Sequence, residues 1–342
     1  TAAFACLSWA LVEMPIRRRS ILSSDKRFIA SVATVGLALA AMGLLFWVAD
    51  GLPNRFSPAI QDAIEVDYGF HSDAERCLTL SPSQLANGDW CKYGSDEPLA
   101  QRVVVWGDSH ALALLPAFES LANDNDVALY FATTSSCRPL IGLRHVGQRK
   151  EHRDRCQTFN SAVLSGIARI DPAIVIVSSF WTYPSMRFSA EEENGVSADD
   201  AFANGLRQML GRPEIAGRDV CLVLDVPRFD YSIPRAFGRA IILETTMESL
   251  SMDRTVAEMQ SEPAETVFEQ FAATGEIRLV DPKESLCSET ECRAVSPAGR
   301  PLYRDDNHLS VYGASFVQPS LEGCFRFTSP PPFSPTIETI SQ

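Results

Sequence analysis

Short apolar runs alternate with longer amphipathic stretches from residue 101 to near the C-terminus. The runs are rich in β-branched residues, as buried strands are, and fall at Val103–Trp106, Val127–Ala132, Ile174–Ser178, Val220–Leu224 and Ile277–Val280. The helical stretches between them are Ala111–Ala122, Phe159–Ile170, Ala198–Leu210 and, with interruptions, Glu244–Ala273. This alternation predicts an α/β domain over residues 100–328, with a parallel sheet, helices on both faces and ligands at the carboxyl ends of the strands.

A second pattern lies near the N-terminus, where Phe28–Ala49 contains no charged residue. At about 1.5 Å per residue a helix of this length spans roughly 33 Å, enough to cross a bilayer. Basic residues precede it and acidic residues follow it, so the positive-inside rule places everything after Asp50 outside the cytoplasm. A buried core helix is the alternative.

The segments around this helix have distinct compositions. The apolar run Phe4–Val12 comes before the arginines at 17–19, whereas a signal peptide carries its charges first. Because the chain opens at Thr1 inside an apolar segment, we expect it to be the C-terminal part of a longer protein. Residues 20–50 are predicted to be a cytoplasmic link and the membrane helix, 51–99 a polar, proline-containing linker and extension, and 329–342 a disordered tail.

The bulk composition limits the partners. The chain has 342 residues, of which 46% are hydrophobic, as in ordinary globular proteins. Its net charge of −13 argues against a nucleic-acid partner, which favours a basic surface.

Nine cysteines fit an exported domain. Local pairing predicts the disulfides Cys77–Cys91, Cys137–Cys156 and Cys287–Cys292. Cys221 lies in an apolar strand candidate and is interpreted as a core residue, and Cys324 is expected to be unpaired. A zinc site is the competing interpretation, but the chain has no Cys-x-x-Cys pair, so no metal is predicted.

The first chemical motif is Gly107-Asp108-Ser109-His110, which follows an apolar strand and precedes a helical stretch. Ser109 should therefore lie where a strand ends and a helix begins. Backbone N–H groups point outward there with the positive end of the helix dipole, which suits a nucleophile and an oxyanion. The alternative is a loop whose serine only caps the helix.

The second motif is Asp305-x-x-His308, where the spacing lets a carboxylate hold the imidazole. A serine early and Asp-x-x-His late in an α/β chain resembles the SGNH (GDSL-like) hydrolase family. Trp106 and the segment Asp306–Ser310 resemble a narrower group of SGNH domains. These are fused to membrane-bound acyltransferase 3 proteins, which O-acetylate cell-surface polysaccharides. The apolar start, ending in Glu13-Met-Pro15, resembles the last helix of that membrane domain, so residues 1–19 are identified as its end.

This resemblance implies a flavodoxin-like, three-layer fold preceded by one to two transmembrane helices. It also implies that Ser109 is the nucleophile, that His308 is the base and that Asp305 orients His308. The backbone N–H of Ser109 would be one oxyanion donor. The family usually adds a glycine and an asparagine, but segments 133–139 and 178–184 contain neither at those places.

Other residues could take those places. Ser136 and Ser179 are our candidate oxyanion donors, and Trp181 is expected to line the site. Asp108 is expected to brace the turn. For His110 a local hydrogen bond is favoured over a catalytic role, and for Arg304 an exposed salt bridge over binding of an anionic sugar.

The implied function is O-acetyl transfer to an envelope polysaccharide, such as lipopolysaccharide O-antigen, exopolysaccharide or peptidoglycan. Acetyl-CoA would be the donor through the membrane domain, and this chain itself would bind no cofactor. The implied location is the bacterial inner membrane, with the SGNH domain in the periplasm. The same residues would also suit a carbohydrate esterase, and a non-catalytic glycan-binding module is the alternative from another class. The sequence gives no indication of the oligomeric state.

Overall fold

The computed structural model describes residues 2–18, 24–49, 51–55, 71–78, 80–146, 149–181, 187–190, 198–243, 245 and 250–326. The chain divides into two compact units, residues 1–62 and 63–342, which are described separately. The predicted tail at 329–342 lies outside the described residues.

The first unit is helical. It contains α1 (Ala2–Ser8), the π-helical turn η1 (Trp9–Glu13), α2 (Met14–Arg17), α3 (Asp25–Val48) and the short η2 (Pro53–Arg55). The 24-residue α3 is long and apolar enough to cross a membrane, by length and composition. None of its side chains is buried. A helix that is apolar around its whole circumference is typical of a membrane span or of a core.

The second unit is built on a six-stranded sheet. Its strands lie in the order β1 (Cys91–Gly94), β3 (Ala128–Thr133), β2 (Arg102–Gly107), β5 (Ile174–Ser178), β7 (Asp219–Val223) and β9 (Arg278–Val280). All neighbours are parallel except the edge pair β1–β3. Counted along the chain, the parallel strands have the flavodoxin-like order 2-1-3-4-5, which confirms the predicted fold class.

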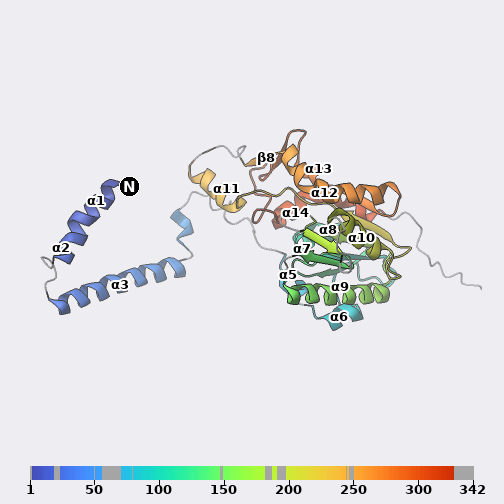
Figure 1. Cartoon of the computed structure of the whole chain (residues 1–342), viewed down its shortest axis with the longest axis horizontal. Helices are drawn as coiled ribbons and strands as arrows, with labels where there is room; N and C mark the ends of the chain where they lie inside the picture. The colour runs from blue at the N-terminus through green and yellow to red at the C-terminus, as the bar shows by residue number, and fades with distance from the viewer. Residues whose placement is uncertain are drawn as a thin grey trace, which may run out of the picture. The chain divides into compact units, whose positions relative to one another are not determined.

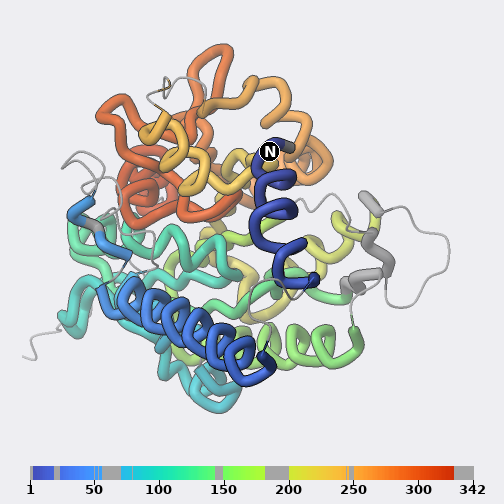
Figure 2. Tube along the Cα trace, turned by 90° about the vertical axis from the view of Figure 1, so that its left-hand side faces the viewer, coloured from blue at the N-terminus to red at the C-terminus, as the bar shows by residue number. Residues whose placement is uncertain are grey.

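Helices cover both faces of this sheet (Figure 1). Because side chains alternate along a strand, Val103 and Val105 of β2 belong to one core cluster while Val104 and Trp106 belong to the other. The first face is covered by α7 (Ser109–Ala113), α8 (Leu115–Asp124), α11 (Ile233–Ile242) and α14 (Val311–Leu321). The second is covered by α6 (Pro82–Asn87), α9 (Lys150–Ile170), α10 (Ala198–Leu210) and α12 (Arg254–Ala273). In Figures 1 and 2, α6 lies directly against α9 although they are far apart in sequence.

The strands lie where the sequence predicts them, but some helices differ. The stretch Ala111–Ala122 forms two helices, because Pro116 stands in the first turn of α8 and cannot donate to a helix that continues through it. In the described part of Glu244–Ala273, α12 begins at Arg254, where Asp253 caps the helix by accepting a hydrogen bond from the Thr255 N–H at 2.8 Å. Neither α11 nor α14 was predicted.

Residues of the predicted linker 51–99 belong to the domain. β1 extends the sheet at its edge, and the short α5 (Ala74–Leu78) carries Cys77 into the core. The unit also holds α13 (Lys283–Leu286), η4 (Glu322–Phe325) and two small sheets, which pair β8 (Ser251–Asp253) with β10 (Glu291–Arg293) and β4 (Leu143–Val146) with β6 (Arg187–Ala190).

Four disulfides connect these elements. The three predicted pairs have S–S distances of 2.17, 2.01 and 2.00 Å. The expectation of an unpaired Cys324 was wrong: its sulfur lies 1.98 Å from that of Cys221, which is a buried residue of β7 as interpreted. Sequence spacing could not show this, because 103 residues separate them and only the packing of η4 near β7 brings them together. In a chain-entropy model, closing a loop of that size stabilises a fold by about 4–5 kcal/mol.

Candidate active site

Ser109 lies at the reversal point of the strand order. β2 has β3 on one side and β5 on the other, so the crevice at its carboxyl end opens at the topological switch point of the sheet. The strand ends at Gly107 and α7 begins at Ser109. Asp108 caps α7 by accepting a hydrogen bond from the backbone N–H of His110 at 2.9 Å. The backbone N–H of Ser109 is therefore one of the donors at the helix start that lack an intrahelical acceptor.

A tight loop brings the second motif to the same place. Residues 303–309 form a loop closed by the bridge Tyr303–Leu309, and the Arg304 N–H donates to the carbonyl of His308 at 2.9 Å. Within it, the Asp305 Oδ1 accepts the N–H of Asn307 at 2.9 Å and that of His308 at 2.7 Å. These bonds explain the three-residue spacing, because Asp305 fixes the backbone of the residue whose ring it contacts.

Ser109, His308 and Asp305 form one hydrogen-bonded chain. The His308 Nε2 lies 2.9 Å from the Ser109 Oγ, across 199 residues of sequence, and its Nδ1 lies 2.8 Å from the Asp305 Oδ2. The His308 side chain is 20% exposed and that of Asp305 is 40% exposed, so small molecules can reach the site. This geometry is what a nucleophile, a base and an orienting carboxylate require.

The charges of the site favour a neutral imidazole. Burial raises the pKa of Asp305, but hydrogen bonds from the His308 ring and from two backbone N–H groups outweigh it, so the pKa lies well below its usual range. Burial lowers the pKa of His308, and the charge of His110 adds to this while Asp305 opposes it. A neutral His308 beside an ionised Asp305 can accept a proton from Ser109.

A pH dependence follows. Protonation of His308 removes the base, so the rate at which Ser109 is modified should fall as the pH decreases through the pKa of His308. Since that pKa is lowered, the half-maximal rate should lie below about pH 6.5, the ordinary value for histidine. Labelling rates of Ser109 by a fluorophosphonate between pH 4 and 9 measure it, and a midpoint clearly above 6.5 would contradict the burial argument.

The structure places the other predicted site residues as follows. Ser179, at the end of β5, is buried beside the carboxylate of Asp108. Ser136 has a φ of +58° in the turn after β3, and its carbonyl lies 3.2 Å from the His152 Nε2. The indole of Trp181 lies in the core, where its N–H donates to the carbonyl of Val223 at 2.8 Å, so it does not line an open site.

Asp108 braces the turn, as expected. Besides the His110 N–H, its carboxylate lies 3.2 and 3.3 Å from the backbone N–H of Phe180, which joins the turn after β2 to the loop after β5. Burial alone raises the pKa of Asp108, but the nearby ring of His110, together with Ser179 and Arg138, outweighs it and the pKa falls to about 2.

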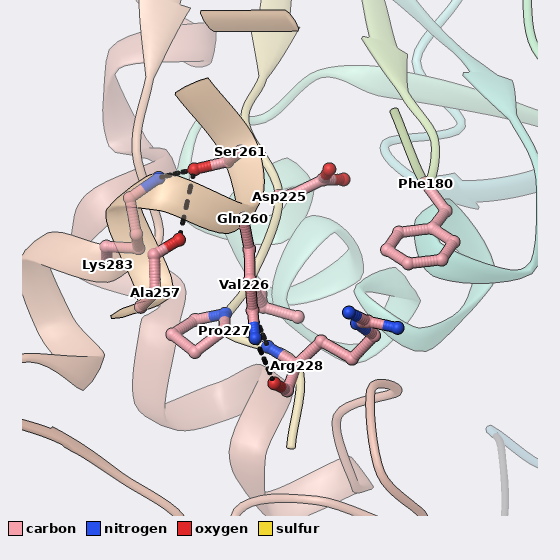
Figure 3. Close-up of a pocket in the computed structure, with 9 residues that line it drawn as sticks. All are labelled: Phe180, Asp225, Val226, Pro227, Arg228, Ala257, Gln260, Ser261 and Lys283. Carbon is pink, nitrogen blue, oxygen red and sulfur yellow. Dashed lines mark hydrogen bonds between the residues drawn. The ribbon is translucent and has the colours of Figure 1, made fainter. Parts of the chain in front are cut away.

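Two cavities adjoin the site and were not predicted. One, of about 10 Å³, is lined by residues that include His110, Ser179 and Leu309. The other, also of about 10 Å³, lies among the loops after β5 and β7 (Figure 3), and each has room for roughly one water molecule. In Figure 3, the side chain of Arg228 extends toward the ring of Phe180. No motif marks Phe180 or Arg228; only their position directly after strand candidates could have drawn attention to them.

One group in the described part of the chain has metal-ligating residue types within reach of each other: Cys137, His152 and Cys156. The two sulfurs are bonded to each other, so they do not offer thiolate ligands.

Comparison with known proteins gives a family match. A model of the protein family described as "SGNH domain (fused to AT3 domains)" matches residues 76–323. No curated protein is similar in sequence to this chain at a significant level.

Several solved structures are similar. The periplasmic domain of the lipopolysaccharide acetyltransferase of Salmonella ser. Paratyphi A is 18% identical over 75% of this chain and 97% of its own, with a TM-score of 0.48. The catalytic domain of the Streptococcus pneumoniae peptidoglycan O-acetyltransferase A is 12% identical over 66% and 93%, with a TM-score of 0.31. A family two carbohydrate esterase from Clostridium thermocellum is 10% identical over 66% and 63%, with a TM-score of 0.35.

Proposed function

Because this chain belongs to the family of SGNH domains fused to AT3 domains, we propose that it transfers an acyl group, most simply acetyl, to a hydroxyl of an envelope polysaccharide. The observation that carries the proposal is the chain of hydrogen bonds from Ser109 through His308 to Asp305, at 2.9 and 2.8 Å. Serine is a weak nucleophile at its own pKa and becomes effective only with an adjacent base.

In the first half-reaction, the Ser109 Oγ attacks the carbonyl carbon of the acyl donor while its proton moves to the His308 Nε2. The negative charge that develops on the carbonyl oxygen faces the backbone N–H of Ser109 at the start of α7, with Ser136 or Ser179 as further candidate donors. The bond to the leaving group then breaks, His308 returns its proton to that group, and the acyl group remains as an ester on Ser109. Asp305 stabilises the imidazolium while it exists.

In the second half-reaction, a sugar hydroxyl takes the place of the leaving group. His308 accepts the hydroxyl proton, the sugar oxygen attacks the ester, and Ser109 leaves with the proton from His308. Water in place of the sugar would make the same site an esterase, so the outcome depends on which acceptor occupies the crevice. We propose that the acceptor approaches Ser109 from the open side of the site, where the side chains of His308 and Asp305 are partly exposed.

The acyl group is proposed to come from acetyl-CoA on the cytoplasmic side, passed on by an AT3 membrane domain. In this arrangement α3 crosses the inner membrane and the SGNH domain lies in the periplasm, where its disulfides are stable. Lipopolysaccharide O-antigen, exopolysaccharide and peptidoglycan are the acceptor classes that this location offers. This chain supplies the nucleophile and base and is proposed to bind no cofactor of its own.

Labelling and transfer together test this function. A fluorophosphonate should label the full chain at Ser109, and an acetyl ester such as 4-nitrophenyl acetate should donate its acetyl group to an added glycan faster than to water. Labelling with hydrolysis but without transfer would establish the esterase instead. A folded chain that is neither labelled nor active would support the alternative of a non-catalytic glycan-binding module.

The membrane arrangement has a separate test. A reporter enzyme that is active only outside the cytoplasm should be active when fused after Leu99, because the basic residues at 17–19, 26 and 27 gather at the N-terminal end of α3 whereas Arg55 alone follows it before residue 76. The matched control is a fusion after Arg19, which should be inactive. The reverse pattern would reject the proposed orientation.

A further inference from the structure

The ring of His110 lies between two other rings at the centre of the site. Its centroid is 4.2 Å from that of His308, with an angle of 33° between the ring planes, and 4.5 Å from that of Phe180, at 11°. The three rings come from α7, from the loop after β5 and from the loop before α14. One face of the His308 imidazole is therefore covered by another side chain.

The backbone holds His110 in this place. Its ring is 9% exposed, and within the described part of the chain neither ring nitrogen has a hydrogen-bond partner. The nearest carboxylate oxygen, of Asp108, is 3.7 Å from the Nδ1, which is too long for a hydrogen bond. That same carboxylate accepts the backbone N–H groups of both His110 and Phe180. Asp108 thus fixes the backbone of both His110 and Phe180, whose rings stack, and the His110 ring lies tilted against that of His308.

The hydrogen bonds of His308 leave one motion free. They act at its two nitrogens, toward Asp305 and Ser109, and both lie near the plane of the ring. Two such bonds define an axis through the ring but do not stop it from tilting about that axis. The His110 ring, packed against one face of the imidazole, opposes the tilt and also keeps water from that face.

We propose that His110 is a positioning residue, whose ring packs against His308 and holds the imidazole in the orientation that lets Nε2 take the proton of Ser109. This inference rests on the proposed function, since it needs His308 as the base. It assigns to His110 no contact with the reacting atoms. It also gives a reason for a ring directly after the nucleophile.

The charges around His308 make the role measurable. The groups that face it are Asp305 from its own loop, Ser109 and His110 from α7, and Asp108 from the turn before α7. Burial lowers the pKa of His308, and the charge of His110 lowers it further. A phenylalanine at position 110 would keep the ring and its packing but remove that charge, so the pKa of His308 should rise.

The experiment compares rates of fluorophosphonate labelling of the full chain in detergent, from pH 4 to 9, for the wild type, H110A and H110F. Loss of one aromatic contact should slow labelling by H110A about tenfold at the high-pH plateau. H110F should regain most of that rate, with its acid limb moved to higher pH. H71F is the matched control, because His71 contacts Glu119 and Tyr93 and should change neither quantity.

The outcomes separate the inference from the function on which it rests. A folded H110A with the rate and acid limb of the wild type would overturn the inference. So would an H110F as slow as H110A, which would mean that a ring nitrogen of His110 takes part in the chemistry. If H110A does not fold, H110F decides alone: a labelling rate close to that of the wild type supports the packing role, and a slow H110F overturns it. If the wild type is not labelled at all, the proposed function itself is wrong, and the inference about His110 fails with it.

Discussion

Replacing Ser109 or His308 by alanine should reduce acyl transfer by about 10⁴- to 10⁶-fold, the range seen when a serine nucleophile or its base is removed. Ser109→Ala removes the hydroxyl oxygen that lies 2.9 Å from the His308 Nε2, and His308→Ala removes the group placed to accept its proton. The two losses should not add in the double variant, because the residues act as a unit. Acetyl transfer from an activated ester to glycan, measured on the full chain, gives the comparison.

The Asp305→Asn variant should have an intermediate effect on acyl transfer. Asp305 orients the ring and stabilises its cation but does not attack, so its loss should cost less than either alanine variant. The loss of acyl transfer should still be large, because the carboxylate accepts hydrogen bonds from two backbone N–H groups as well as from the ring. All three variants should unfold at the wild-type temperature within a few degrees. A Ser109→Ala variant that keeps more than a hundredth of the activity would exclude Ser109 as the nucleophile.

The strands and the residues of the hydrogen-bonded chain were accessible from the sequence for a physical reason. Buried parallel strands are apolar on both faces, so runs such as Val103–Trp106 and Ile174–Ser178 stand out from their surroundings. The motifs containing Ser109 and His308 also carry local turn geometry, and the carboxyl edge of the sheet then brings them together. Both signals are local in sequence, and the fold adds only the approach of Ser109 to His308.

What the sequence did not show depends on contacts between distant segments. The Cys221–Cys324 pair needs the chain to return from α14 to the side of β7, and α11 and α14 lie among glycines and prolines that weaken their helical pattern. Trp181 follows a strand, as site residues do, but its N–H finds the carbonyl of Val223 inside the core. The stack of Phe180, His110 and His308 combines three segments, and no spacing rule predicts it.

Gly107, two residues before the nucleophile, should also be highly sensitive to substitution. β2 and β5 pair in register with Gly107 opposite Ser178, and a Cβ on Gly107 would lie 1.8 Å from the carbonyl oxygen of Ser178 and 2.6 Å from the Cβ of Ala111. The first of these is a backbone atom in the middle of a parallel sheet, so it cannot turn away as a flexible side chain could. The end of β2 would have to move, and Ser109 begins two residues later.

We therefore expect Gly107→Ala to lower the free energy of unfolding by about 3 kcal/mol or more, at the severe end of overpacking substitutions. The fraction that folds should also label slowly, because a displacement of about 1 Å at a nucleophile costs roughly 10²-fold in rate. Chemical unfolding followed by tryptophan fluorescence measures the first effect, and fluorophosphonate labelling of Ser109 in the full chain measures the second.

Gly238→Ala is the matched control for this substitution. Gly238 lies inside α11 with no atom within 4 Å of the added methyl group, so alanine should leave labelling unchanged. The helix should gain about 0.5–1 kcal/mol, because alanine loses less backbone entropy on folding than glycine does. Equal stability and labelling in the two variants would contradict the close approach of β2 and β5 at Ser178. The position of Ser109 at the switch point of the sheet would then need another explanation, because that approach is what sets where the strand ends and the helix begins.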